Sequence, residues 1–256
     1  MRLSRCFPLS VFSIAMCIGS ALAEPTDIVV RVMAKDAKFI GTAVGGAEIS
    51  LRDAETGEVL AEGVTEGGTG DTPKIMTTPR SSRENISTPE AAQFATTLEL
   101  DRPRKISVTA IGPAIPDGAA VTASSTQWVV PGKHITGGDA WVVELRGFSV
   151  SLVEHPPSEI KLDTGGRIPL SAKVTMLCGC PIDSGGMWDA DKIEVAAAIM
   201  KNGARVDLVP LSFAGEVNIF KGEIEIDEPG EYTIDLYAYD PSNGNTGVTQ
   251  FAVRVL

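Results

Sequence analysis

Residues that could do chemistry gather in one stretch, which runs Met176-Leu-Cys-Gly-Cys-Pro-Ile-Asp-Ser-Gly-Gly-Met-Trp-Asp189. Cys178 and Cys180 are the only cysteines outside the first 23 residues. They can form a disulfide with each other, as thiols do in an oxidising compartment. Alternatively, two thiolates with Met176 or Met187 would be soft sulfur ligands of the kind that bind Cu(I). A third possibility is a redox-active dithiol, because a bridge across one residue is strained and easily reduced.

No catalytic constellation accompanies this stretch. His134 and His155 are the only histidines, and neither lies in a recognisable motif for nucleophilic catalysis or zinc binding. We therefore expect no catalytic residue, no resident metal and no cofactor, with copper as the alternative. Aromatic residues make up only 5% of the chain, so we expect three tryptophans to pack in the interior rather than to stack on sugar: Trp128, Trp141 and Trp188.

The first 23 residues have the layout of a secretory signal. A basic start at Arg2 and Arg5 precedes an apolar run, and a small-x-small cleavage site ends at Ala23. Cleavage there would place residues 24–256 in the periplasm or outside the cell. Acylation of Cys17 is the alternative. No run approaches the roughly 20 apolar residues that a membrane span requires, so we expect none.

The charge of the chain restricts its partners. It carries 22 basic and 33 acidic side chains, for a net charge of −11. A polyanion without a basic stripe repels nucleic acid and anionic membrane surfaces. We therefore expect neither as a partner.

Apolar and polar residues alternate along most of the chain, which is the period of β-strands. Clusters of Gly, Pro, Asp and Thr separate the runs, and no window sustains a helical period. In residues 24–147 the apolar positions of these runs are Ile28, Val30, Val32, Ile49, Leu51, Val59, Leu60, Leu98, Leu100, Ile106, Val108, Trp141, Val143 and Leu145. We predict an all-β protein with two tandem β-sandwich domains.

Residues 24–147 form the first predicted domain. The segment Val44-Gly-Gly-Ala-Glu-Ile-Ser-Leu-Arg-Asp-Ala-Glu-Thr-Gly-Glu-Val-Leu-Ala-Glu-Gly-Val-Thr65 resembles the opening hairpin of a transthyretin-like, carboxypeptidase-regulatory-type sandwich, with an Asp-x-x-Thr-Gly turn. A long polar loop, residues 63–92, follows without any periodic pattern. We expect it to be a mobile surface loop, because its glycines lack the Gly-Lys-Ser/Thr of a phosphate-binding loop.

Residues 148–256 form the second predicted domain, and seven short alternating runs there indicate an immunoglobulin-like sandwich. Asn202-Gly203 predicts a hairpin turn between two of the strands. The tail Phe220-Lys-Gly-Glu-Ile-Glu-Ile-Asp-Glu-Pro-Gly-Glu-Tyr-Thr-Ile-Asp-Leu-Tyr-Ala-Tyr-Asp240 resembles the last strands of bacterial immunoglobulin-like modules. The resemblance implies a tyrosine corner at Tyr232 and says nothing about function, because this architecture serves many roles.

In an immunoglobulin-like topology, the loop between strands two and three lies at the same end as the loop between strands six and seven. Side chains of a strand alternate between its two faces, and Met176 is expected to face the core. Cys178 and Cys180, two and four positions later, would then face the core as well. One pole of the domain would then gather Cys178, Cys180, Met187, Trp188, Asp189, Asp240, Asn243 and Asn245. We expect residues 240–245 to form a turn rather than a calcium site.

These observations predict an exported, non-catalytic binding or accessory protein. Its Cys178–Asp189 end would face a protein partner of the cell envelope, with Trp188, Asp189, Asp240, Asn243 and Asn245 as the partner-facing pole. The alternative is a periplasmic copper-handling or thiol-redox accessory protein that uses Cys178 and Cys180.

Overall fold

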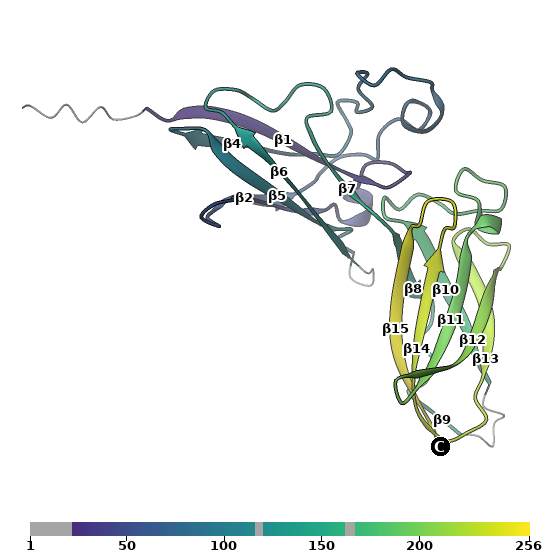
Figure 1. Ribbon diagram of the computed structural model, residues 1–256. Helices are drawn as coiled ribbons and strands as arrows, with labels where there is room; N and C mark the ends of the chain where they lie inside the picture. The colour runs from purple at the N-terminus through teal and green to yellow at the C-terminus, as the bar shows by residue number, and fades with distance from the viewer. Residues whose placement is uncertain (1–21, 116–119, 162–166) are drawn as a thin grey trace, which may run out of the picture.

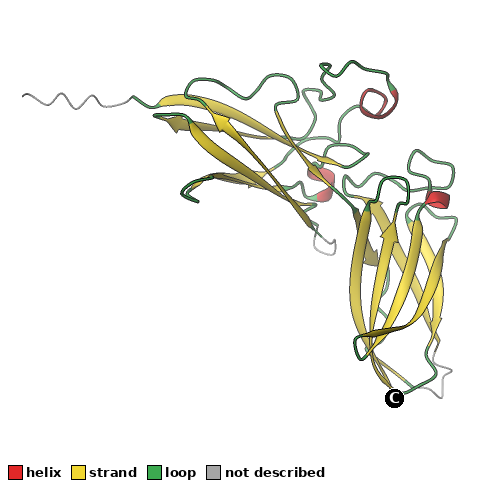
Figure 2. Ribbon diagram, in the orientation of Figure 1, coloured by secondary structure: helices red, strands yellow, loops and turns green. Residues whose placement is uncertain are grey.

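A computed structural model of the protein describes residues 22–115, 120–161 and 167–256. Nearly all of the predicted signal segment lies outside these residues. The chain is all-β and forms two tandem sandwiches, which are the two bodies of Figure 1. Figure 2 shows that, within the described residues, helical structure is confined to short turns between strands, namely η1 (Thr42–Val44), η2 (Pro73–Thr77) and η4 (Ala190–Lys192).

The first sandwich has two sheets. One has the strand order β4-β1-β7, in which β1 and β7 run parallel, and the other has the order β3-β2-β5-β6. The strands are β1 (Glu24–Ala34), β2 (Glu48–Asp53), β3 (Val59–Val64), β4 (Phe94–Leu100), β5 (Arg104–Gly112), β6 (Val121–Val129) and β7 (Trp141–Leu145).

The second sandwich is one folded sheet with the order β8-β10-β13-β12-β11-β14-β15-β9. Strand β12 pairs with β11 over most of its length and with β13 only at Ser212 and Phe213, so it passes from one layer to the other. Its strands are β8 (Phe148–Leu152), β9 (Glu159–Ile160), β10 (Arg167–Met176), β11 (Glu194–Lys201), β12 (Ala204–Phe213), β13 (Ile219–Glu225), β14 (Gly230–Tyr239) and β15 (Thr246–Val255).

The alternation in the sequence corresponds to burial in the structure. On β10 every second residue is buried, namely Ile168, Leu170, Ala172, Val174 and Met176. On β1 the same holds for Ile28, Val30 and Val32. Buried residues of both sandwiches belong to one connected hydrophobic cluster, and burial of such side chains stabilises the fold by roughly 1.5–3 kcal/mol each.

Two local motifs take the predicted form. Asn202 and Gly203 both have positive φ, at 54° and 78°, as a tight hairpin turn requires. The hydroxyl of Tyr232 donates a hydrogen bond of 2.9 Å to the carbonyl of Glu228, so the tyrosine corner is present. Trp128 differs from its prediction, because its side chain is 60% exposed on the edge strand β6.

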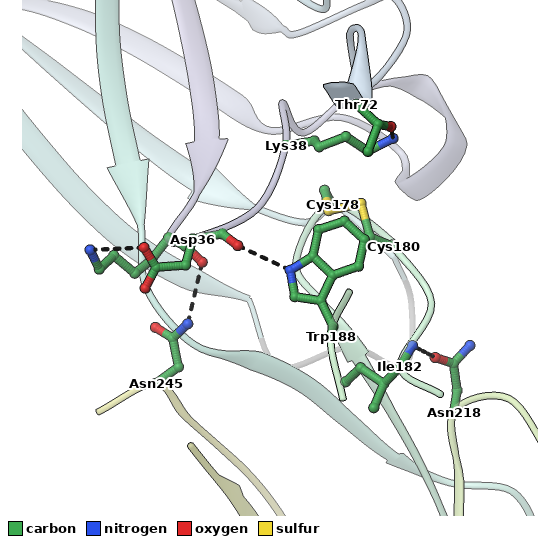
Figure 3. Close-up of a disulfide and its surroundings, with 10 residues drawn as sticks. Asp36, Lys38, Thr72, Cys178, Cys180, Ile182, Trp188, Asn218 and Asn245 are labelled. Atoms are coloured by element: carbon green, nitrogen blue, oxygen red, sulfur yellow. Dashed lines mark hydrogen bonds and ion pairs between the residues drawn. A yellow bond between two sulfur atoms is a disulfide. The ribbon is translucent and has the colours of Figure 1, made fainter. Parts of the chain in front are cut away.

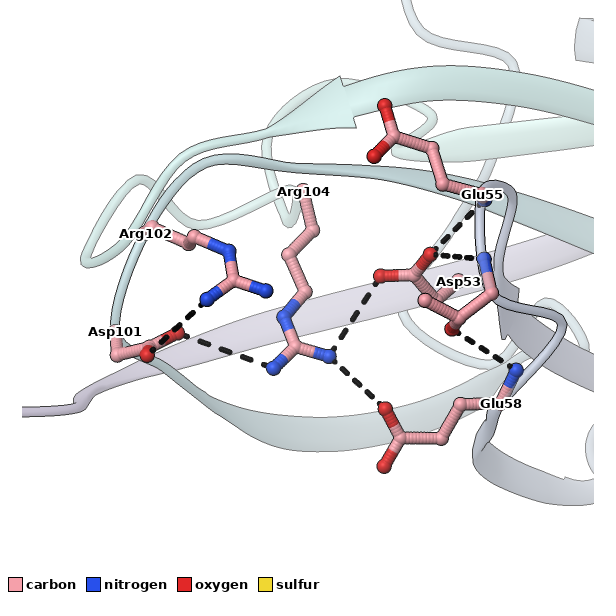
Figure 4. Close-up of polar contacts among 7 residues, drawn as sticks. Asp53, Glu55, Glu58, Asp101, Arg102 and Arg104 are labelled. Carbon is pink, nitrogen blue, oxygen red and sulfur yellow. Dashed lines mark hydrogen bonds and ion pairs between the residues drawn. The ribbon is translucent and has the colours of Figure 1, made fainter.

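The Asp-x-x-Thr-Gly turn between β2 and β3 is held by one carboxylate. Asp53 accepts hydrogen bonds of 2.9 Å from the backbone N–H groups of Glu55 and Thr56. Figure 4 shows Arg104 reaching from β5 between Asp53, at 3.6 Å, and Glu58, at 3.1 Å. The N–H groups of Thr56 and then Glu55 lower the pKa of Asp53, and Arg104 lowers it further.

Segment 63–92 was expected to be a mobile loop; in the structure residues 77–85 are exposed, but side chains from outside the segment hold the part that follows. Its returning half is held by Arg31 of β1, whose Nη1 donates to the carbonyls of Ala91, at 2.5 Å, and Ala92, at 3.1 Å. The guanidinium of Arg31 also lies 5.8 Å from the centre of the Phe39 ring. Burial lowers the pKa of Arg31, although the Asp139 carboxylate opposes this shift.

Asp139 anchors the same segment from the other side. Its carboxylate accepts hydrogen bonds from the backbone N–H groups of Ile86, at 2.9 Å, and Ser87, at 2.8 Å. Burial raises the pKa of Asp139, but these N–H groups outweigh it, so the pKa is held below its usual value. Ile86 packs in a small second cluster with Phe39, Ala91 and Ala92, so the segment covers apolar surface.

Candidate functional site at the domain junction

The two cysteines form a tight turn directly after β10. The N–H of Gly179 donates to the carbonyl of Met176 at 2.8 Å, and the φ of Gly179 is +76°, a value that glycine adopts without strain. Cys178 and Cys180 are joined by a disulfide, with their Cα atoms 5.4 Å apart. Both are buried, but Leu177 between Met176 and Cys178 is buried as well, so the alternation used to predict their burial ends at Met176. A disulfide of this kind indicates an oxidising compartment.

The loop that follows is organised by Asp189. This side chain accepts hydrogen bonds from the N–H groups of Gly185, at 3.0 Å, and Asp191, at 3.2 Å, and pairs with Lys192 at 3.2 Å. The hydrogen bond from the N–H of Gly185 is the main cause that lowers the pKa of Asp189, and the hydrogen bond from the Lys192 ammonium is the next. The carboxylate therefore stays ionised and fixes the loop tip that carries Met187.

The loop between β14 and β15 lies at the same end of the sandwich. Asp240 accepts bonds from the N–H and hydroxyl of Ser242, at 2.8 and 2.6 Å, and the N–H of Gly244 donates to its carbonyl at 2.9 Å. The N–H of Asn245 donates to the Oδ1 of Asn243 at 2.8 Å. These bonds make residues 240–245 the expected turn.

This end of the second sandwich faces the first sandwich. Figure 3 shows the indole Nε1 of Trp188 donating to the carbonyl of Asp36 at 3.0 Å, beside the disulfide. The Nδ2 of Asn245 donates to the carbonyl of Lys35 at 3.3 Å. A Cβ on Gly179 would come within 2.5 Å of Val44 in η1, so the cysteine turn also touches the first sandwich.

A hollow of about 280 Å³ opens at this junction, and we call it the junction hollow. The second sandwich contributes most of its wall, and the first contributes Asp36 and Met76. Its lining residues are Asp36, Met76, Phe148, Met176, Met187, Trp188, Asp189, Lys192, Ile193, Asp240, Ser242 and Asn243. Apolar side chains from both sandwiches and three carboxylates thus surround one small volume.

The structure brings most of the sequence-predicted pole together. Met176, Met187, Trp188, Asp189, Asp240 and Asn243 all line the junction hollow. Asn245 does not, because it is 2% exposed and its side chain is used in the contact with Lys35. Cys178 and Cys180 lie beneath the surface as a disulfide and present no thiolate. Local sequence patterns gave no signal for Asp36, Met76 or Phe148, because their neighbours in the hollow are distant in the chain.

Among residues 22–115, 120–161 and 167–256, no group of three or more His, Cys, Asp or Glu side chains is arranged to hold a metal ion. Within the same residues, no helix has the length and apolar character needed to cross a membrane.

Comparisons with known proteins give similarity in structure only. No protein-family model matches the sequence, and no curated protein matches it. The fibronectin(III)-like modules of Clostridium thermocellum CbhA share 11% identity, with 91% of this chain and 93% of that chain covered, at a TM-score of 0.28. A tandem of titin immunoglobulin domains shares 9% identity, with 91% and 96% covered, at a TM-score of 0.23. Both TM-scores are low, so the immunoglobulin-like sandwich assignment rests on the strand pairing described above.

Proposed function

We propose that this is an exported, non-catalytic binding or accessory protein that holds a protein partner of the cell envelope at its junction hollow. The observation that supports the proposal is the convergence of Met187, Trp188 and Asp240 with Asp36 of the first sandwich around one hollow. Ligand sites occur preferentially where two domains meet, and flexible methionine side chains adapt to a partner surface.

The charge of the hollow favours one kind of partner group. Three aspartates line it, and two of them pair with a lysine, Asp36 with Lys35 and Asp189 with Lys192, so a net negative charge remains. A basic side chain of the partner, with an apolar stem, would place the stem against Phe148 and Met176 and its charge near the carboxylates. Capture should therefore weaken as salt screens this attraction.

A pair of matched substitutions tests the proposal. Met187→Arg puts a bulky positive charge at the mouth of the hollow, whereas Val206→Arg makes the same change on β12, near the hairpin at the opposite end of the sandwich. The two side chains are similarly exposed in the wild type, at 49% and 56%. We expect Met187→Arg to reduce capture of the envelope partner more than about tenfold and Val206→Arg to leave it unchanged. Equal capture by both variants would remove the proposal.

A further inference from the structure

Three methionines from separate segments of the chain line the junction hollow. Met76 comes from segment 63–92 of the first sandwich, Met176 ends β10, and Met187 lies in the loop before η4. The sequence contains seven methionines, two of which are in the predicted signal segment. Three of the other five therefore meet in one hollow that has twelve lining residues. No single strand or helix brings them together, so the periodic packing of one element does not account for their convergence.

We propose that the junction hollow binds one Cu(I) ion through the thioethers of Met76, Met176 and Met187. Polarisable sulfur prefers soft ions, and thioethers are among the ligands that select Cu(I). None of the lining residues in the described part of the chain is a histidine, and both cysteines are bridged, so the hollow lacks the imidazole and thiolate ligands typical of zinc. Thioethers remain available as donors in an oxidising compartment, where the thiols form the disulfide.

The surroundings of the three thioethers suit a small monovalent cation. Asp36 pairs with Lys35 at 3.3 Å and Asp189 pairs with Lys192 at 3.2 Å, while Asp240 adds a third carboxylate, so these groups together leave a net negative charge that attracts cations. The aromatic rings of Phe148 and Trp188 also line it, and the faces of such rings attract cations.

The exposure of the three methionines provides a route into the site. Met176 is buried, Met76 is partly buried and Met187 is 49% exposed, so the three side chains differ in their access to solvent. A methionine side chain has three rotatable bonds, so Met187 can swing out to admit an ion and return to ligate it.

This inference deepens the copper-handling alternative and moves its ligands from the cysteines to the methionines. Metal binding can be tested independently of partner capture, because the measurement needs only the purified chain and the metal. A bound ion and a basic side chain of the partner would compete for the same hollow.

Titration of the full mature chain with Ag(I), a soft monovalent analogue of Cu(I), tests the inference without a reductant. The Cys178–Cys180 bridge then stays closed, and a thiol assay on the same sample verifies this. We expect one Ag(I) per chain. Met187→Leu and Met76→Leu conserve side-chain volume, and each should weaken binding about tenfold or more, because even the loss of an outer-shell partner costs roughly 10–100-fold. Met200→Leu, on β11 and outside the hollow, is the matched control and should bind as the wild type does.

A second readout does not depend on affinity. Hydrogen peroxide converts accessible methionines to sulfoxides, and peptide mapping should show that bound Ag(I) protects Met187 and Met76 but not Met200. Absence of stoichiometric binding would overturn the inference. So would equal binding by Met187→Leu, Met76→Leu and Met200→Leu, or loss of binding only in a Cys178→Ser/Cys180→Ser variant. If Ag(I) does not bind but the partner is still captured, the copper site is wrong and the proposed function stands. If Ag(I) binds but the partner is not captured, the proposed function is wrong and the copper site stands.

Discussion

At the scale of single residues, the Cys178–Cys180 bridge can stabilise the fold only modestly. The two cysteines are two positions apart, so the bridge closes a very short loop, and the chain-entropy relation gives about 1.5 kcal/mol for it. We expect reduction of the bridge in the wild-type protein to lower the free energy of unfolding by about that amount, measured by urea denaturation with and without a reducing agent. A much larger loss would mean that the bridge also holds the junction with Val44.

Asp53 gives a prediction for pH. Its folded-state pKa lies below the value of about 3.9 expected in the unfolded chain, so its stabilisation is fully present above that pH and is lost as pH falls through the folded-state pKa. Asp53→Asn should therefore be less stable than the wild type at neutral pH. It should also lose less stability than the wild type when the pH is lowered to about 3. Urea midpoints at both pH values measure this, and parallel losses in the two proteins would contradict it.

Residue-level predictions from the sequence succeeded where the chemistry is local. The Asn202-Gly203 turn and the Tyr232 corner depend on backbone geometry and on a bond across only four positions, so neighbouring residues reveal them. Trp128 was predicted to be buried but is exposed, because composition alone does not say which face of an edge strand is covered.

At the scale of elements, segment 63–92 depends on two distant side chains. Arg31→Met would remove the hydrogen bonds to Ala91 and Ala92, and bonds from a charged group contribute roughly 1.5–3 kcal/mol. A loss of about 2 kcal/mol in local stability corresponds to about thirtyfold more opening. Limited trypsin digestion should then cleave the segment, at Lys74, Arg80 or Arg83, at least tenfold faster than in the wild type.

Two further variants make the digestion decisive. Asp139→Ala removes the acceptor of the Ile86 and Ser87 N–H groups and should accelerate the same cleavages. Arg52→Met, at an exposed position of β2, should not. If wild-type protein is cut in this segment as fast as Arg31→Met, the anchoring account is wrong.

Sequence patterns predicted the strands well and the anchored segment poorly, for one physical reason. Strand alternation is set by which face of a sheet is buried, and each strand carries that signal itself, as β10 does. The order of segment 63–92 comes from Arg31 and Asp139, which lie outside it in the chain, and no periodicity within the segment reports such partners. The same reasoning explains why Met76 was not predicted as a site residue.

At the scale of the whole molecule, the junction should make the two sandwiches unfold together. Trp188→Phe keeps an aromatic ring but removes the hydrogen bond to Asp36, and Asn245→Ala removes the hydrogen bond to Lys35. Each of these hydrogen bonds contributes about 1 kcal/mol. We expect one calorimetric transition in the wild type and two partly separated transitions in the double variant. Arg254→Met, which removes an exposed bond to Glu231 at the opposite end of the sandwich, is the control. Two resolved transitions in the wild type would show that the junction does not couple the sandwiches.

The sequence predicted that two loops of the second sandwich would share one end, because that follows from immunoglobulin-like topology. It did not indicate that this end would face the first sandwich. The hydrogen bonds of this contact end on the main-chain carbonyls of Lys35 and Asp36, which any residue type would provide, so the identity of these two side chains carries no signal for them. The junction hollow, and with it the candidate site, is therefore a property of the assembled chain.

Site-specific photo-crosslinking in the native compartment tests the central claim most directly. A photo-reactive phenylalanine analogue would replace Met187 at the mouth of the junction hollow or, in a second strain, Val206 at the opposite end of the sandwich. The account predicts one discrete envelope protein joined to position 187, lost when salt is raised, and no such adduct at position 206. The same adduct at both positions, or at 206 alone, would contradict it.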